Sequence, residues 1–483
     1  MPESSWRESD SFNEFELLRA LADAQLTEEE LPQPQQRDRR RRKAAMLLAV
    51  IWSSTIALHL VAWGFWVIIV LTTVMGLHAV RVLLARPLPV PDPLTDADLE
   101  TAPLVTLMVA AKNEEAVIGR LIKQLCNLDY PAHRYEVWAI DDNSSDRTPA
   151  VLQQLAEQYP QLRIFQRPEG ASGGKSGALN QVLPLTRGEV VAVFDADAQV
   201  SPDLLRRVLP LFDRSTLGAV QVRKAISNGM GNLWTRGQTA EMALDSFFQQ
   251  QRIAIGGIGE LRGNGQFVRR AALERCGGWN EETITDDLDL TLRLHLDQWD
   301  IDFMMLPTVE EEGVTHAIAL WHQRNRWAEG GYQRYLDYWK LILGKRLGFR
   351  KKVDLVLFWI TQYILPTAAV PDLVMTVLRS RSLLLSPVTD VSITLSVLGM
   401  MLGLRQIRKS RLAIAGDTEV TRRKPFMIFR LLFQALYGTL YMLHWFPVIA
   451  STTARMAVRP KRLKWVKTTH QGADGPWTDS RVS

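Results

Sequence analysis

The chain has 483 residues, with 57 Lys and Arg against 52 Asp and Glu, which gives a formal net charge of +5. Its mean hydropathy of −0.06 is typical of a soluble protein, but the apolar residues are concentrated in two regions near the ends of the chain. Cys126 and Cys276 are the only cysteines, too few for a metal cluster or a disulfide framework, and we interpret both as buried thiols in a reducing compartment.

The N-terminal region predicts a tail followed by membrane helices. Residues 1–43 are polar and end in the basic stretch "RDRRRRK", so we expect a mostly disordered tail. Residues 44–84 contain no Asp, Glu or Lys, and this run is twice as long as the ~20 residues of one bilayer crossing. Gly64 lies near its middle, which predicts two transmembrane helices. Basic flanks stay in the cytoplasm, so the stretch favours membrane anchoring over nucleic-acid binding.

Residues 101–345 form a soluble block whose first half alternates strands and helices. Strand patterns at 104–111, 135–141, 163–166 and 189–197 are separated by helical patterns, among them 114–128 and 147–159. This alternation favours a parallel α/β sheet, in which ligands bind at the carboxyl ends of the strands. Three strands end in polar clusters: Lys112-Asn113-Glu114, Asp141-Asp142-Asn143 and Asp195-Ala196-Asp197.

The C-terminal region is apolar again. Runs at 353–378, 383–404 and 426–450 predict helices that span the membrane or lie in its interface. Proline residues inside these runs would kink or shorten the helices. Basic residues flank the last run on both sides, which leaves its topology open. We expect membrane helices over 353–452 and a basic tail over 453–483.

Several of the polar clusters have residue types suited to binding a phosphorylated ligand. Asp195 and Asp197 could share a hard divalent ion, although a lone pair of this kind is more often part of a turn. Asp286 and Asp287 precede an amphipathic helix, which carboxylates at that position can simply cap. The stretch "HQRNRWAEGG" supplies arginine forks for pyrophosphate and a Trp for stacking, or is merely a basic helix.

In order and spacing, these clusters resemble the membrane-associated branch of the inverting family 2 glycosyltransferases, with the pattern D, D, D, Q(Q/R)xRW. The match covers Leu104 to Gly331, and Asp287 and Gln323 are 36 positions apart (323 − 287), a spacing typical of this branch. The resemblance implies an α/β fold of the GT-A type. A Rossmann-like nucleotide-sugar-binding domain would be flanked by transmembrane and interfacial helices.

The resemblance also implies roles for the matching residues. Asp287 would be the general base, and Asp195 and Asp197 would hold Mg²⁺ or Mn²⁺. The nucleotide sugar would be bound by Asp141, Asp142, Lys175, Asp195, Gln323, Arg324, Arg326 and Trp327. Lys175 lies in "GGKSGALN", which is similar to the K-x-G-A-L-N segment of the family. It does not form a P-loop, because Glu169 stands where the first glycine of that motif is required.

The acceptor is the least determined part of the prediction. Polysaccharide synthases that make cellulose or hyaluronan carry the same motifs, and transferases to other lipids are a further alternative. A scaffold that kept the fold without chemistry is disfavoured by the intact carboxylates. The whole chain, including its start "PESSWRESDSF", resembles cyanobacterial enzymes that move glucose from UDP-glucose to 1,2-diacylglycerol. We favour that reaction, in an integral protein of the plasma or thylakoid membrane with its catalytic domain in the cytoplasm and no nucleic-acid partner.

Overall fold

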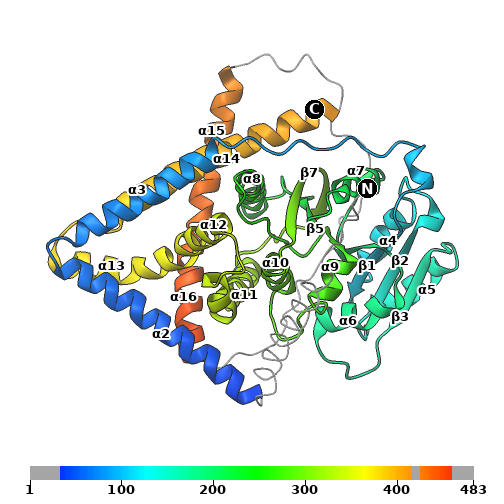
Figure 1. Cartoon of the computed structure of the whole chain (residues 1–483), viewed down its shortest axis with the longest axis horizontal. Helices are drawn as coiled ribbons and strands as arrows, with labels where there is room; N and C mark the ends of the chain where they lie inside the picture. Colours follow the sequence, from blue (N-terminus) through cyan, green and yellow to red (C-terminus); the bar gives the residue numbers. More distant parts are fainter. Residues whose placement is uncertain (1–32, 415–424, 460–483) are drawn as a thin grey trace, which may run out of the picture.

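The computed structural model of the chain describes residues 33–414 and 425–459, with a sheet-containing body beside a group of long helices (Figure 1). Most of the predicted N-terminal tail and residues 460–483 of the C-terminal tail lie outside the described residues. The basic stretch of the N-terminal tail is the exception. Residues 37–43 belong to helix α2, Gln33–Leu60, so the expected disordered tail does not extend to residue 43.

The body is built on one seven-stranded sheet, whose strand order is β3-β2-β1-β4-β6-β5-β7. The strands are β1 Val105–Ala111, β2 Tyr135–Asp141, β3 Leu162–Gln166, β4 Val190–Asp195, β5 Leu217–Ile226, β6 Gln266–Arg269 and β7 Asp300–Glu311. The four strands β3, β2, β1 and β4 are parallel, as the alternating pattern predicts. The second half of the sheet is mixed, because β6 runs antiparallel to both β4 and β5, whereas β5 and β7 are parallel to each other. Since β6 has only four residues, it carries too short a pattern to be recognised in the sequence.

Helices cover both faces of the sheet, and the central strands are buried on both sides. In β1, Leu107 and Val109 face one apolar cluster, which includes residues of α4, Ile118–Cys126. Met108 faces the other cluster, with residues of α6, Gly174–Val182, and α10, Asp286–Leu296. This explains the continuous apolar run in the sequence. Shorter helices complete the cover: α5 Thr148–Ala156, α7 Leu204–Val208 and α9 Arg270–Arg275.

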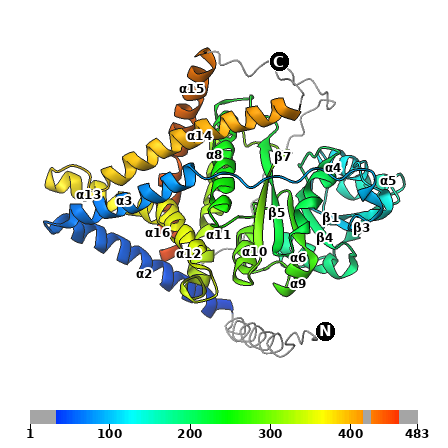
Figure 2. The ribbon, with the colours of Figure 1, turned by 45° about the horizontal axis from the view of Figure 1, so that its top comes forward.

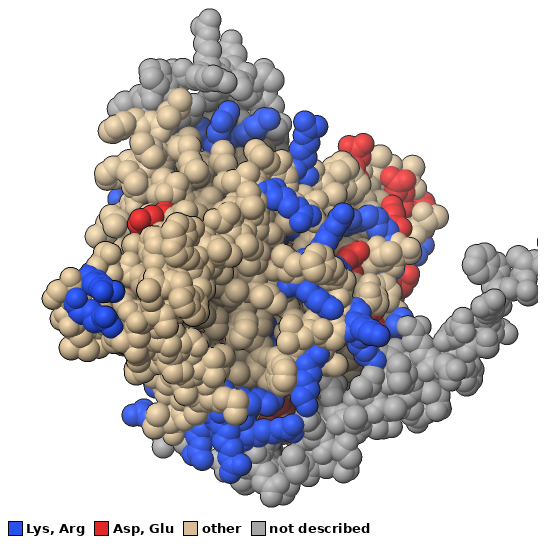
Figure 3. Space-filling view, turned by 60° about the vertical axis from the view of Figure 1, so that its left-hand side comes forward, with Lys and Arg blue, Asp and Glu red and all other residues tan. Residues whose placement is uncertain are grey.

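The long helices extend away from the sheet and meet at a tip (Figures 1 and 2). Four segments are long and apolar enough to cross a membrane: Arg39–Leu60 in α2, Gly64–Leu83 (α3), Phe349–Arg379, and Ser386–Ser410 in α14. The third consists of α12 Phe349–Trp359, a π-helical turn and α13 Leu365–Arg379, and α14 is Ser386–Ile414. Figure 3 shows a broad face of the helical part with little charge, bordered by Lys and Arg.

Three further helices join these segments to the body: α8 Leu233–Ala254, α11 Ala317–Leu343 and α16 Trp445–Val458. The sequence predicts one apolar element over 426–450, but the structure has two helices there, α15 Pro425–Met442 and α16. They break at Leu443 and His444, and Pro447 follows in the first turn of α16, where proline is tolerated.

Asp372, which interrupts an apolar run of the sequence, is fully paired in the structure. Its carboxylate accepts hydrogen bonds from His59 of α2 at 2.7 Å and from the backbone N–H groups of Leu384 and Leu385. A polar group inside a membrane segment has to be satisfied by the protein itself. Asp372 therefore fixes the turn between α13 and α14 against α2.

Candidate functional site

The predicted strand-end clusters meet at one edge of the sheet. Ala110 of β1 lies opposite Ile140 of β2 on one side and opposite Asp195 of β4 on the other. Asp141 and Asp195 are therefore both the last residues of neighbouring parallel strands. Because parallel strands place their carboxyl ends at the same edge, the two acidic clusters point into the loops above it.

Asp142 is held by an arginine, Arg167, that no sequence motif marks. The side chain of Arg167 is fully buried, and its Nη1 donates to Asp142 Oδ1 at 2.5 Å. The same guanidinium donates to Ser172 O at 2.5 Å and to Gln181 Oε1 at 3.1 Å. Arg167 thus ties the loop after β2 to the loop before α6. Its only signal in the sequence is a single Arg before Pro168, which nothing distinguishes from a surface residue.

Lys175 points from the first turn of α6 toward the acidic cluster and pairs with Asp195. Burial opposes the charge on its ammonium group, but Asp195, Asp286 and Asp287 outweigh burial and raise the pKa of Lys175. The turn before it needs a glycine. Gly173 has φ +82°, and a Cβ there would lie 2.1 Å from an oxygen of Glu281. The glycine-rich stretch therefore serves to bring a lysine to the strand-end carboxylates.

The predicted base lies at the start of α10, in a buried acidic pair. Asp287 Oδ1 accepts the N–H of Leu288 at 2.8 Å, and a Cβ on Gly263 would lie 3.4 Å from Asp287 Oδ2. Burial, and then repulsion from Asp286, raise the pKa of Asp287 to about 6. Burial and the charge of Asp195 also raise the pKa of Asp286, although the charge of Lys175 acts in the opposite direction. The Oδ2 atom of Asp286 is buried without a hydrogen-bond partner. A carboxyl group titrating near neutral pH is suited to accept a proton.

Two further cations face these carboxylates. Lys224 of β5 pairs with Glu311 at 2.9 Å and lies 5.5 Å from the centre of the Trp327 ring. Burial lowers the pKa of Arg326 of α11, while Asp195 and Asp287 act in the opposite direction, which places its guanidinium near both. With Lys175, these side chains surround the acidic cluster with positive charge. Such an arrangement can bind a pyrophosphate group.

Arg324, predicted to act beside Arg326, has different partners. It is fully buried, donates to Glu241 of α8 at 2.5 Å and stacks on Trp327, 4.2 Å from the ring centre. The indole N–H of Trp445 in α16 donates to the other oxygen of Glu241 at 2.8 Å. Two residues correspond to about 200° around a helix, so Arg324 and Arg326 leave α11 on nearly opposite sides.

Two other residues of the motif in α11, Asn325 and Gln323, have different surroundings from Arg326. Asn325 accepts hydrogen bonds from Thr452 and Arg455 of α16. Gln323 Oε1 is buried without a hydrogen-bond partner. Of the motif 323–327, Arg326 is thus the residue brought to the carboxylates, while Arg324 and Asn325 join α11 to α8 and α16.

The two predicted metal ligands offer oxygen atoms only. Asp197 Oδ2 accepts the N–H of Glu312 at 3.0 Å, and the carboxylate of Asp195 is 41% exposed. In residues 33–414 and 425–459, no group of three or more His, Cys, Asp or Glu is arranged to hold a metal. The carboxylates of Asp195 and Asp197, together with the unpartnered Oδ2 of Asp286, fit a hard divalent ion, which prefers oxygen ligands. Such an ion also binds the phosphates of the substrate.

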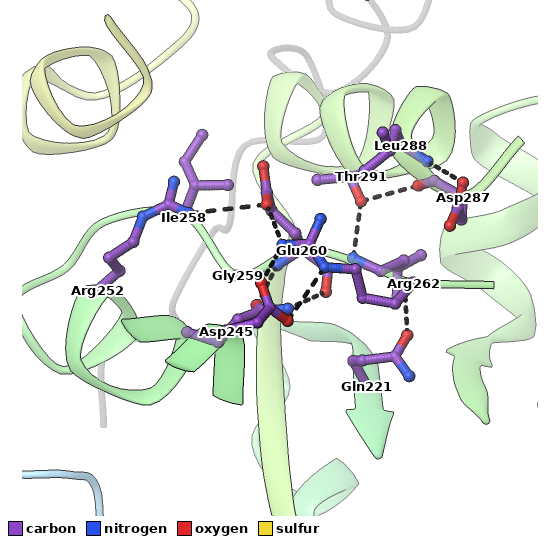
Figure 4. A network of polar contacts seen from close by, with 12 residues as sticks. Gln221, Asp245, Arg252, Ile258, Gly259, Glu260, Arg262, Asp287, Leu288 and Thr291 are labelled. Atoms are coloured by element: carbon purple, nitrogen blue, oxygen red, sulfur yellow. Dashed lines mark hydrogen bonds and ion pairs between the residues drawn. The ribbon is translucent and has the colours of Figure 1, made fainter. Parts of the chain in front are cut away.

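A buried network of charges supports the segment behind the base (Figure 4). Glu260 is fully buried, and its carboxylate lies 2.8 Å from Arg334 Nη1 and 3.0 Å from Arg262 Nη2, with Arg252 Nη1 at 3.7 Å. Arg252 also pairs at 2.8 Å with Asp354, in the first half of α12. Together these pairs link α12, the first part of a candidate membrane segment, to the segment 258–263.

This segment contacts the base-bearing helix through Thr291. The N–H of Leu261 donates to Thr291 Oγ1 at 2.9 Å, and that hydroxyl donates to the carbonyl of Asp287 at 2.8 Å (Figure 4). The buried charges therefore determine where Gly263 and Arg262 lie relative to Asp287. No sequence motif marks Glu260, which stands in an unremarkable stretch, "GGIGELRGNG".

Comparison with known proteins gives consistent results. Residues 102–330 match the family model described as "Glycosyltransferase like family 2". The chain is 59% identical to a "Beta-monoglucosyldiacylglycerol synthase" of Trichormus variabilis, over 98% of this chain and 100% of the relative. A protein of the same name from Synechocystis is 54% identical over 98% of each chain. Among solved structures, a mannosyltransferase of Pyrobaculum calidifontis in complex with GDP-Man and Mn²⁺ has a TM-score of 0.51 at 20% identity, covering 81% of this chain and 99% of that one.

Proposed function

The chain belongs to the glycosyltransferase-like family 2, and from this premise we propose that it transfers glucose from UDP-glucose to 1,2-diacylglycerol. The observation that carries the proposal is the identity of 59% along the whole length of a relative named for that product. The likeness extends through the membrane helices, where an acceptor lipid would enter, and is not confined to the nucleotide-sugar domain. The carboxylates and cations at the acidic edge of the sheet are of the types that such a transfer requires, which supports the proposal.

In the proposed mechanism, Asp287 takes the proton of the free hydroxyl of diacylglycerol. The oxygen attacks the anomeric carbon of glucose while the bond from that carbon to the β-phosphate oxygen breaks, and UDP leaves. One displacement inverts the configuration, so an α-linked donor gives a β-glucoside. Lys175, Lys224 and Arg326 would balance the charge that develops on the diphosphate. A divalent ion held by Asp195 and Asp197 would neutralise part of the same charge.

We further propose that the catalytic body faces the cytoplasm. The basic start of α2 contacts this body directly, because Arg40 pairs with Asp337 of α11 at 2.8 Å and Lys43 donates to Leu336 O at 3.0 Å. Basic residues at the ends of membrane segments are retained on the cytoplasmic side. The body packed against this stretch would therefore lie on the same side, where nucleotide sugars are made.

The test of the proposed function is a transfer assay in membranes that contain the full chain. Labelled UDP-glucose, Mg²⁺ and diacylglycerol are expected to give an organic-soluble product that migrates as a monoglucosyl lipid. UDP-galactose in place of UDP-glucose tests the donor in the same assay. Label in an insoluble polymer would instead make the chain a polysaccharide synthase.

The rate of transfer is expected to rise with pH through about 6, because Asp287 acts as a base only when it is ionised, and its pKa is raised to about 6. Below that pH the carboxyl group holds its own proton and the reaction stops. Replacing Asp286 with asparagine removes the repulsion that helps to raise this pKa, so the acidic limb should move to lower pH. The measurement is kcat/KM from pH 5 to pH 8 for both proteins. A limb that stays in place in the Asp286→Asn variant would contradict the assignment of Asp287.

Removal of divalent ions is expected to abolish transfer, because Asp195 and Asp197 alone would repel the diphosphate. Dialysis against EDTA followed by the transfer assay checks this, and Mn²⁺ or Mg²⁺ should restore the rate whereas Ca²⁺ should restore less, since it prefers a larger coordination shell. An unchanged rate after dialysis would show that lysine and arginine side chains balance the diphosphate without a metal.

A further inference from the structure

A cavity of about 410 Å³ lies beside the first turn of α12, apart from the acidic edge of the sheet. Its lining includes Gly256, His295, Phe349, Arg350 and Lys351. This volume lies within the range of ~300–1,000 Å³ that is usual for small-ligand sites. None of the lining residues belongs to the proposed transfer site.

The cavity lies at the start of a segment that is long and apolar enough to cross a membrane. α12 begins at Phe349, the first residue of a segment long and apolar enough to span a bilayer. Arg81, in the last turn of the spanning helix α3, donates to the carbonyl of Ile255 at 3.1 Å, next to Gly256 of the lining. One end of each of two candidate membrane segments therefore lies beside the cavity. Phe349, at the rim, is 80% exposed.

The charge around the cavity is positive and incompletely balanced. α12 starts with three consecutive basic residues, Arg350, Lys351 and Lys352, and has no acidic residue in its first turn. Lys351 is satisfied, because it donates to Asp300 at 2.7 Å and to His295 Nδ1 at 3.2 Å. In the described part of the chain, no acidic side chain pairs with Arg350. Basic side chains at a helix N-terminus interact unfavourably with the positive end of the helix dipole. An anion bound there would neutralise the basic side chains and interact favourably with the dipole.

We propose that this cavity binds the phosphodiester headgroup of an anionic phospholipid. Arg350 would pair with the phosphate, the first N–H groups of α12 would donate to its oxygens, and Phe349 would lie against the start of the acyl chains. A lipid fits the position better than free phosphate does, because the cavity opens where two membrane helices end. The bound lipid would also lie close to the base-bearing helix, since His295 is near the end of α10 and its Nε2 donates to Gly259 O at 2.9 Å.

The test uses the purified full chain in detergent with phosphatidylglycerol or phosphatidylcholine. Native mass spectrometry, which does not depend on the proposed reaction, should show phosphatidylglycerol adducts retained on the wild-type protein. Arg350→Gln should weaken this retention by ~5-fold, the effect of one basic residue at an anionic surface. Lys352→Gln is the matched control: it removes the same charge two positions along the helix, outside the cavity lining, and should change retention little.

Three outcomes would overturn the proposal. Equal losses in both variants would mean that diffuse surface charge attracts the lipid and that the cavity has no part in it. Displacement of phosphatidylglycerol by millimolar inorganic phosphate would make the cavity a site for a soluble anion. Equal retention of phosphatidylglycerol and phosphatidylcholine by the wild-type protein would show that the cavity does not recognise an anionic headgroup. Loss of glucose transfer alone, with retention unchanged, would bear on the proposed function and not on this site.

Discussion

Replacing Asp287 with asparagine is expected to lower the rate of glucose transfer by about 10³-fold, the middle of the range for a lost general base. The amide keeps the size of the side chain and can still accept the N–H of Leu288 through its oxygen. It cannot take a proton from the acceptor hydroxyl. The variant should therefore lose kcat while keeping its affinity for UDP, which titration calorimetry on the purified protein measures.

Asp286→Asn is the matched control for this prediction, because it removes the same charge from the neighbouring position of the same helix. Its base is intact, so its rate at pH 8 should stay within about tenfold of the wild type. If the two variants lost activity equally, Asp286 and Asp287 would act only through their combined charge. A wild-type rate in the Asp287 variant would place the base elsewhere.

Replacing Glu260 with glutamine is expected to destabilise the protein by about 3–5 kcal/mol, because it leaves buried arginines without their shared counter-charge. Arg334 and Arg252 are themselves buried, and neither can turn toward water. The loss should appear as a lower midpoint of thermal unfolding in detergent. Transfer should fall as well, since segment 258–263 would no longer be held against Asp287.

Asp245→Asn provides the comparison for Glu260, because Asp245 also pairs with Arg262, at 2.6 Å, but its side chain is 40% exposed. An exposed pair contributes only about 0–1 kcal/mol, so this variant should unfold close to the wild-type midpoint. If Glu260→Gln were equally mild, water would have to reach the network, and the buried arginines would not depend on Glu260. For the Glu260→Gln variant, transfer kinetics measured on the folded fraction separate a change in kcat from a change in KM.

The predicted α/β fold of the GT-A type is confirmed by the family match and by the mannosyltransferase structure. Its first half was predictable because the central strands β1, β2 and β4 are buried runs followed by polar residues, and such runs have a clear length and boundary. The second half was not. β5 and β7 continue into bulges and irregular pairing, and β6 is too short for any periodicity.

The candidate site divides in the same way. Carboxylates at strand ends and helix starts could be found in the sequence, because local structure determines where they point. Arg167 and Glu260 could not be found, because their importance comes from partners far away in the chain, such as Asp142 and Arg334. The position of Arg324 could not be predicted for the same reason. Its motif predicts pyrophosphate binding, but its partner in the structure is Glu241 of α8. The roles of the individual site residues remain predictions for the variants described above.

The contacts between α11 and α16 have a consequence for how the protein is made. Asn325 and Arg324, within the motif helix, are held by Thr452, Arg455 and, through Glu241, by Trp445. These partners leave the ribosome more than one hundred residues after α11 ends (445 − 343 = 102). A nascent chain that has completed all four segments able to cross a membrane would still lack the α16 contacts of its own motif helix. The motif helix would therefore have its full set of contacts only after synthesis has continued to α16.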